Sequence, residues 1–512
     1  MKKFLIGLSL PLVMLFILTS GGCDKTPPPD AKRYEDYGER LLSIFKNLIP
    51  HSEAAWDEGA FSPDKRNFII KNLRFTYSFP EAEPSPDSDG KRQLLYRGEI
   101  AEMVLEEPNI QVGLQEGVAP LAQRITRSGV SLRITPQDGR ASILVTAKEE
   151  VDVVPEGPWQ DILALSGQKE ADRDAVIANL SRLQAQSTET SEITLRPKED
   201  EKAAFTIGRV QASRIGPFHA DKVLVSKTEF NDPDGPGNGV FAIDEMEFIY
   251  DLRQIITALY KDPNIFKNYQ TLAEYKFNLS LLLRNIKMED GNVSFTVKDF
   301  SLAYQNDSSL TSRLGMNEFR VENDWLSRDS SSRQLASILQ GSPLLLSLAV
   351  QGEYIKDGFA ANTLSLSAPK LANINIEALA SGPPSDFISD NQELRFEEAL
   401  AWLRENVLFK ELSLRYEDEG LIDAVIAIVA EMQGVAPAQM REALTEQCRS
   451  FGALSSGFIK ELAQAAAGLL SAPGGRLSLS LTPAQPMPAR ELMESLFNST
   501  DAGETKYIIS TD

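Results

Sequence analysis

The sequence predicts an α+β protein, with a long, mainly antiparallel curved β-rich body, inserted amphipathic helices and a C-terminal helical subdomain. A ten-residue strand pattern recurs at residues 68–77, 241–250, 295–304 and 407–416. Many linkers between the expected strands are too short for crossover helices, which favours antiparallel connections. After residue 416 the alternation of apolar and polar residues gives way to helical periodicity.

The recurring pattern contains a change of phase, seen most clearly in FTVKDFSLAY at residues 295–304. Phe295 lies on one face by strict alternation, whereas Phe300 and Leu302 fall on the opposite parity. A bulge or bend near Lys298 brings both sets to one face. The sequence therefore predicts a curved sheet with one apolar face, which either forms a groove or packs as an ordinary core.

The N-terminal residues are arranged like a secretory signal sequence. Two lysines precede an apolar run at residues 4–18, and small residues lead to Cys23. This arrangement resembles the lipobox of bacterial prolipoproteins, although Ser20 stands where Leu is usual. The resemblance implies that residues 1–22 are removed and that Cys23 becomes the lipid-modified first residue, which anchors the protein in a membrane. The alternative is an uncleaved helical anchor.

Asp24 resembles the retention signal of lipoproteins that stay in the bacterial inner membrane. The resemblance implies a lipid-anchored envelope protein on the periplasmic face of the inner membrane. Either interpretation of the N-terminal segment places the bulk of the chain outside the cytoplasm.

Composition limits the possible chemistry. A formal charge of −21 over 512 residues excludes nucleic-acid binding through phosphate contacts. Lipidation of Cys23 leaves Cys448 without an intramolecular partner, so no disulfide is expected. His51 and His219 are not in zinc-ligand spacing, and none of the common catalytic or nucleotide-binding motifs appears. We therefore expect no cofactor, no metal and no enzymatic activity.

The expected organisation follows composition along the chain. The segments are a signal peptide at 1–22, an anchor and spacer at 23–33, an N-terminal helix at 34–60, a β-rich body at 61–416 with helical insertions near 159–186 and 251–275, a helical subdomain at 417–472, and a strand, short helix and tail at 473–512. The polar tail is expected to lack regular structure.

The strand copies between residues 68 and 416 resemble the repeated-strand bodies of AsmA-like periplasmic proteins. This resemblance implies the handling of lipids in the envelope and carries over no functional residue. The first hypothesis is a non-enzymatic groove that binds or passes lipid or another hydrophobic ligand. Its candidate lining residues are Phe68, Phe75, Phe295, Phe300 and Leu302.

Two other hypotheses stay open. A structural or assembly lipoprotein would bind another envelope protein through its strands and the helices at 420–472. An envelope hydrolase would need a paired acid and base, which the dispersed carboxylates do not identify. An open apolar groove favours lipid binding, whereas a filled sandwich favours the structural role.

Overall fold

The computed structural model describes most of the chain, in two compact units. Unit 1 comprises Met1–Thr257 with Leu283–Gly291, and unit 2 comprises Ala258–Leu282 with Asn292–Asp512. The predicted signal segment, Cys23 and Asp24 lie outside the described residues. The residues that the structure describes are 31–47, 53–62, 66–80, 93–136, 142–165, 173–197, 204–231, 239–261, 274–290, 293–307, 309–328, 333–354, 359–381, 404–472, 474–497 and 505–511.

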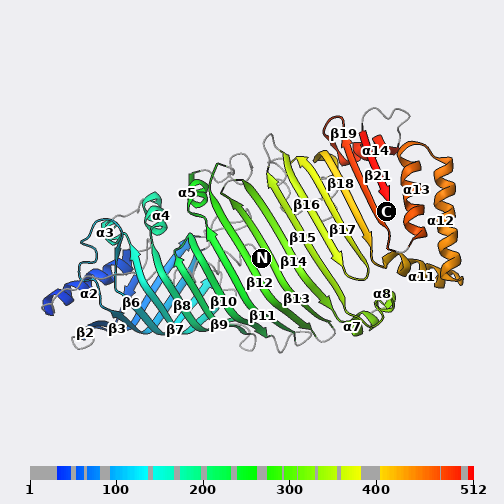
Figure 1. Ribbon diagram of the computed structural model, residues 1–512. Coiled ribbons are helices and arrows are strands. Elements are labelled where there is room, and N and C mark those ends of the chain that lie inside the picture. Colours follow the sequence, from blue (N-terminus) through cyan, green and yellow to red (C-terminus); the bar gives the residue numbers. More distant parts are fainter. Residues whose placement is uncertain are drawn as a thin grey trace. The chain divides into compact units, whose positions relative to one another are not determined.

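Each unit is built on antiparallel strands with helices beside them, which confirms the predicted α+β class (Figure 1). In unit 1, β3 pairs with β1, β2 and β4, and the ladder continues through β6, β7, β8, β9, β10 and β11. The short β5 pairs with β7. The strands are β1 (Glu53–Ala55), β2 (Glu58–Ser62), β3 (Asn67–Pro80), β4 (Gln93–Glu106), β5 (Ala119–Pro120), β6 (Arg124–Pro136), β7 (Ile143–Gly157), β8 (Gln184–Pro197), β9 (Ala204–Ile215), β10 (His219–Asn231) and β11 (Val240–Asp251).

The helices of this region match the predicted positions, with adjusted limits. The N-terminal helix is α2 (Ala31–Asn47), but residues 53–62 form strands instead of continuing it. The first insertion is α3 (Trp159–Ala164) and α4 (Arg173–Ser181). In the second, residues 253–261 form α5 (Arg253–Lys261), and residues 262–273 lie outside the described residues. Strand β12 (Phe277–Asp290) follows and contributes residues to both units.

The predicted change of phase occurs in strand after strand, and an unusual backbone conformation accompanies it. In β9, Ile207 and Val210 are both buried although two residues separate them, and Arg209 between them is exposed. In every second strand of unit 1, a residue with a left-handed φ angle lies at this change of phase, and these residues form one row across the sheet. These residues are Asn72 (φ 55°), Gly129 (φ 61°), Glu192 (φ 51°) and Lys227 (φ 56°).

The bend expected at Lys298 is confirmed in unit 2. Lys298 on β13 (Val293–Asn306) forms an ion pair with Glu318 on β14 (Leu310–Val321), and Nζ lies 3.1 Å from Oε1. Glu318 has φ 48°, and the register between β14 and the next strand shifts between Met316 and Phe319. A residue in the left-handed region allows the apolar set to continue on the same face after the bend.

Gly129 provides a test of this bend. A Cβ atom at Gly129 would lie 2.9 Å from Cβ of Ala101, and the φ of 61° is unfavourable for alanine. We expect Gly129→Ala to lower the free energy of unfolding of unit 1 by about 2 kcal/mol. The control Gly117→Ala (φ 77°) has open space around its Cβ and is expected to cost about 1 kcal/mol. Chemical denaturation of both variants measures the difference, and equal losses would contradict a role for the close contact at the bend.

Helix α2 closes the apolar face of unit 1. Tyr37, Leu41 and Ile44 are almost wholly buried on the helix, and Tyr37 makes an edge-to-face contact with Phe68, with ring centroids 5.1 Å apart. The Arg40 guanidinium donates to the carbonyl of Ile110 at 2.7 Å. Unit 1 thus has a filled core.

Unit 2 has a simple meander. Its ladder runs β13–β14–β15–β16–β17–β18–β19–β21, with the short β20 also paired to β18. Its further elements are β15 (Leu344–Tyr354), β16 (Phe359–Ala368), β17 (Ala372–Ser381), β18 (Leu408–Asp418), β19 (Arg476–Pro483), β20 (Met487–Pro488), β21 (Thr505–Thr511), α7 (Asn323–Arg328), α8 (Arg333–Ile338), α11 (Leu421–Gln433), α12 (Pro437–Leu454), α13 (Gly457–Ser471) and α14 (Ala489–Phe497).

The C-terminal region holds one confirmed and one wrong prediction. The helical subdomain is present as α11, α12 and α13, and Asp418 at the end of β18 accepts the backbone N–H of Ile422 at 3.0 Å. The tail was expected to lack regular structure, yet it forms β21, which pairs along its full length with β19. Tyr507 and Ile509 alternate toward the apolar face, so the tail gains both a ladder and a buried side.

Within the described residues, no single helix has the length and apolar character needed to cross a bilayer. Helices α11 and α12 meet those criteria only as a pair, and the two are bent by 105° at their junction.

Candidate hydrophobic ligand site

The apolar face of unit 2 carries two continuous rows of large side chains. Directly paired residues of antiparallel strands point to the same face, so the register defines each row. The first row is Leu302, Leu314, Val350, Leu364, Ile376, Leu414, Leu479 and Ile509. The second row is Phe300, Met316, Leu348, Leu366, Ile374, Tyr416 and Leu477.

These rows are unusually accessible for a sheet's apolar face. Leu302 is 38% exposed and Val350 is 36% exposed, and the other members from β13 to β18 are half-buried. Antiparallel sheets ordinarily pack one such face against a second layer. A contiguous accessible surface of Leu, Ile and Val is typical of an interaction or ligand site.

Helices pack over the margins of this face. At one end of the strands, Leu326 of α7 and Ala336 of α8 form a cluster with Val321 and with Phe295. At the C-terminal edge, Phe458 of α13 and Leu492 of α14 pack with the row's last members on β19 and β21. The open stretch therefore extends from β13 to β18, which is about 24 Å at the usual spacing between strands.

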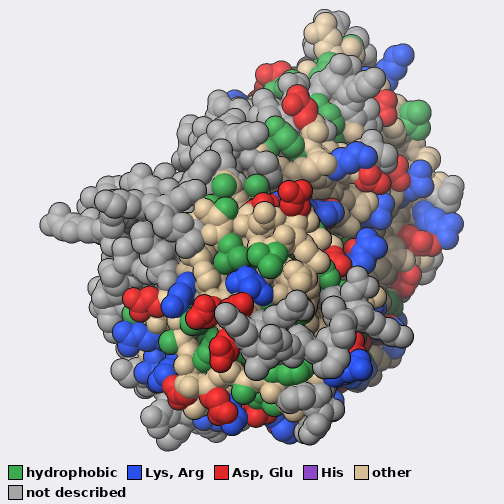
Figure 2. Space-filling model, turned by 90° about the vertical axis from the view of Figure 1, so that its left-hand side faces the viewer, with side chains coloured by type: hydrophobic (Ala, Val, Ile, Leu, Met, Phe, Trp, Pro, Cys, Tyr) green, Lys and Arg blue, Asp and Glu red, His purple; other side chains and the backbone are tan. Residues whose placement is uncertain are grey.

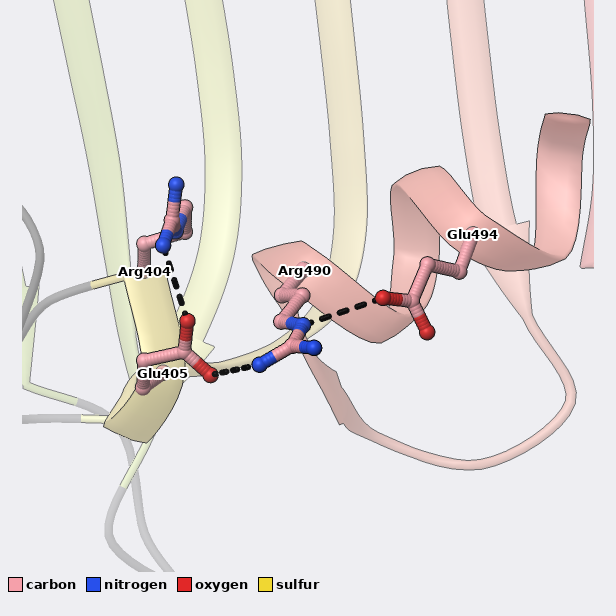
Figure 3. Close-up of polar contacts among 4 residues, drawn as sticks. All are labelled: Arg404, Glu405, Arg490 and Glu494. Carbon is pink, nitrogen blue, oxygen red and sulfur yellow. Dashed lines mark hydrogen bonds and ion pairs between the residues drawn. The ribbon is translucent and has the colours of Figure 1, made fainter.

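An exposed ionic network attaches α14 near the start of β18. Glu405 lies between two guanidinium groups, 3.0 Å from Arg404 and 3.5 Å from Arg490, and Arg490 also contacts Glu494 at 3.0 Å (Figure 3). These pairs are exposed and contribute little to stability individually. They link the start of β18 to the helix that covers the end of the apolar rows, and that helix is packed there through its buried Leu492 and Leu496.

The other face of the same sheet is polar and lined by small residues. A shallow hollow of about 760 Å³ lies there, and Ser301, Gly315, Ala349 and Ser365 form one row across it. Ser365 donates to Asn375 at 2.8 Å. Small side chains on this side and large ones on the other give the two faces opposite character.

The structure places the five candidate groove residues in three environments. Phe68 and Phe75 belong to the core of unit 1, where they are 2% and 4% exposed, and the Phe75 ring packs over Gly98 on β4. They therefore line no open surface. Phe300 and Leu302 lie in the apolar rows of unit 2.

Phe295 occupies a third environment, at the margin of the same face. Its ring centroid lies 5.4 Å from that of Phe319, and both rings pack against the α7–α8 cluster. Sequence reasoning missed most of the row, which consists of aliphatic residues on β14 to β18. Their alternation was visible in the sequence, but the pairing register that aligns them was not.

Three ionisable side chains are buried together in the core of unit 1. Arg127 on β6 donates to Glu150 and Asp152 on β7, and all three side chains are at most 1% exposed. Burial raises the pKa of Glu150 to about 7. Side chains so enclosed cannot contact a substrate, so this cluster acts on stability and not on a reaction.

The described residues offer no obvious metal centre. No group of three or more His, Cys, Asp or Glu side chains among them is placed to hold a metal ion. Acidic and basic side chains are interspersed on the surface shown in Figure 2. Exposed ion pairs such as Lys71–Glu58, at 2.8 Å, belong to such a mixed surface.

Comparison with known proteins finds a match to the C-terminal part of the chain. A family model with the description "Uncharacterized protein" matches residues 365–502, which run from the later part of β16 to just beyond α14. No curated protein matches the chain, and no solved structure does so either.

Proposed function

We propose that this chain is a non-enzymatic, lipid-anchored envelope protein that binds or passes lipid acyl chains on the apolar face of unit 2. One observation carries the proposal: the row from Leu302 to Leu414 presents an aliphatic side chain on each of six neighbouring strands, in half-exposed positions. The predicted lipidation of Cys23 supports the proposal, because it would hold this face close to a source of lipid.

The dimensions of the row suit an acyl chain. The hydrocarbon core of a bilayer is about 30 Å thick and contains two layers of acyl chains, so one chain spans about 15 Å. The open stretch of about 24 Å accommodates such a chain lying across the strands. Non-directional apolar contacts would hold the chain without selecting a particular head group.

Two exposed members of the row allow a test that preserves the fold. We expect Leu302→Asp/Val350→Asp, in the chain from Asp24 onward, to reduce the affinity for a fluorescent fatty acid by about tenfold or more, because an acyl chain would desolvate the new carboxylates. The control Ala349→Asp/Gln351→Asp adds the same charge on β15, at exposed positions on the polar face. It is expected to bind like the wild type.

Two measurements decide the outcome. Mass spectrometry of the purified chain detects lipid carried through purification, and titration measures uptake of the fatty acid. Lipid-free protein without saturable uptake would remove the proposal. Equal losses in both double variants would also contradict it, because the effect would then not depend on the apolar face.

The alternative is a structural or assembly lipoprotein that binds another envelope protein. Its test is a pull-down with residues 420–472 deleted. Loss of one specific partner, together with the absence of bound lipid, would favour this function over lipid binding.

A further inference from the structure

The helical subdomain contains a cavity at the corner where α11 meets α12. The two helices are bent by 105° at their junction, and the cavity of about 980 Å³ is lined by both of them and by Ser471 at the end of α13. Ile426, Pro437 and Ala443 supply apolar parts of the lining. We call this space the corner cavity, and its volume is in the range of small-molecule binding sites.

Thr445 on α12 is a buried polar side chain in the lining of the corner cavity. It is 5% exposed, and its hydroxyl group has no hydrogen-bond partner among the described residues. A threonine within a helix often donates to the carbonyl four residues earlier, but Thr445 makes no such bond. An enclosed hydroxyl without a partner lowers stability, so a ligand that pairs with it gains free energy of binding.

Two carboxylates flank Thr445 on the same face of α12. Glu442 and Glu446 stand one helical turn apart, and both line the corner cavity. Like charges at this spacing repel each other and destabilise a helix. Within the described part of the chain, the Glu442 carboxylate makes no hydrogen bond or ion pair. Glu446 lies 3.8 Å from Arg449, and such an exposed pair is weak.

The other basic side chain of the lining is engaged elsewhere. Arg441 donates to the carbonyl of Leu470 at 2.6 Å and forms an ion pair with Asp423. The lining as a whole has three carboxylates and two guanidinium groups. The corner cavity therefore has an excess of negative charge, which favours a positively charged ligand.

An ammonium group matches the acceptors of this cavity. It carries three N–H donors and no acceptor. Glu442, Thr445 and Glu446 offer three acceptors at helix positions whose Cβ atoms are neighbours, about 5–6 Å apart. No group of three or more His, Cys, Asp or Glu side chains in the described residues is placed to hold a metal ion, so an ammonium group fits better than a metal.

We propose that the corner cavity binds a small aliphatic primary amine, whose ammonium group donates to Glu442, Thr445 and Glu446. The hydrocarbon part of the amine lies against the apolar lining. This site shares no residue with the apolar rows of β13 to β18, and its ligand differs from an acyl chain in both charge and size. It gives the helical subdomain a binding activity of its own, beyond the proposed function.

Saturation-transfer NMR with n-butylamine tests the site in the chain from Asp24 onward. The amine is protonated near neutral pH. We expect saturable binding of n-butylamine and no binding of n-butanol, which lacks the charge. Butyltrimethylammonium has the charge but no N–H donor, so it should bind about fivefold more weakly or worse.

Two substitutions each weaken one acceptor. Glu442→Gln and Thr445→Val should each lower the affinity for n-butylamine by about fivefold or more. Without ligand, Thr445→Val should be at least as stable as the wild type in thermal unfolding, because it removes an unpaired buried hydroxyl. Glu431→Gln is the control: Glu431 is exposed on α11 outside the cavity lining, and its replacement should leave binding unchanged.

Three results would overturn the proposal. They are the absence of saturable n-butylamine binding, equal affinity for butyltrimethylammonium, and equal losses in Glu431→Gln and Glu442→Gln. The last two would show general attraction of cations to a chain of net charge −21. Glu442 is exposed, so its replacement tests the site even if Thr445→Val disturbs the fold. Fatty-acid uptake should be normal in both variants, which distinguishes failure of this proposal from failure of the proposed function.

Discussion

Replacing Arg127 by methionine is expected to lower the free energy of unfolding of unit 1 by about 3–5 kcal/mol. Arg127 is fully buried between Glu150 and Asp152, which lie on the neighbouring strand. Methionine fills a similar volume but leaves two buried carboxyl groups without their guanidinium partner. Loss of one member of a buried ionic cluster costs far more than loss of a surface pair, because the remaining groups stay desolvated.

Hydrogen exchange followed by mass spectrometry localises the effect. Peptides that cover β6 and β7 should lose protection in Arg127→Met, while peptides from unit 2 serve as an internal control. Arg209→Met is the matched surface variant. Arg209 forms a bidentate ion pair with Glu189 at 2.7 and 2.8 Å, and both side chains are substantially exposed. Its expected cost is below about 1 kcal/mol.

A further variant separates desolvated charge from lost packing. Arg127→Met/Glu150→Met/Asp152→Leu removes all three ionisable groups and should recover most of the lost stability, because an apolar replacement leaves no buried group unpaired. If Arg127→Met were as mild as Arg209→Met, the cluster would not stabilise unit 1 as its burial indicates.

The recurring strand pattern was predictable because its cause is local. Lys298 and Asp299 are consecutive polar residues that interrupt strict alternation, and a strand can keep its apolar face only by bending there. The same local logic located α2 and the helices after residue 416. The fold class and the bend at Lys298 therefore followed from sequence periodicity.

The covering of each apolar face was not predictable from the pattern. Phe68 and Phe300 occupy similar copies, yet Phe68 is enclosed beneath Tyr37 of α2, whereas Phe300 lies in a half-exposed row. The copies themselves carry no information on which helix folds back over them. Long-range contact, and not strand propensity, decides between core and open face.

Two further features depended on pairing between distant residues. The first is the buried cluster of Arg127, Glu150 and Asp152. Each of these residues alternates in phase with the buried apolar residues of its strand, which is a weak sign of burial in the sequence. Their contact, however, depends on the register of β6 against β7. The tail strand β21 likewise acquires its structure from β19. Its Thr, Tyr and Ile residues favour a strand, but a single seven-residue strand is not stable without a neighbour to pair with.

The free energy of unfolding of unit 1 should depend on pH through the protonation of Glu150. Burial raises the pKa of this carboxyl from 4.5 to about 7, with the Asp152 charge adding to the rise and Arg127 opposing it. Between about pH 4.5 and pH 7 the folded state therefore retains a proton that the unfolded state has released. The free energy of unfolding should fall by about 3 kcal/mol as the pH rises through this interval, and this contribution should be flat above it.

Glu150→Gln should remove that dependence, because the amide is uncharged at every pH and its oxygen can still accept from Arg127. The variant is expected to match the wild type near pH 5 and to exceed its stability near pH 8, a difference measurable by denaturant unfolding or by exchange of β7 peptides. Glu189→Gln is the control: the hydrogen bond from Arg209 lowers the pKa of Glu189, so that carboxyl is ionised in both states across most of this range. A Glu150→Gln variant that followed the wild-type profile would show that Glu150 stays ionised beside Arg127, in which case the ionic attraction outweighs the cost of burying both carboxylates.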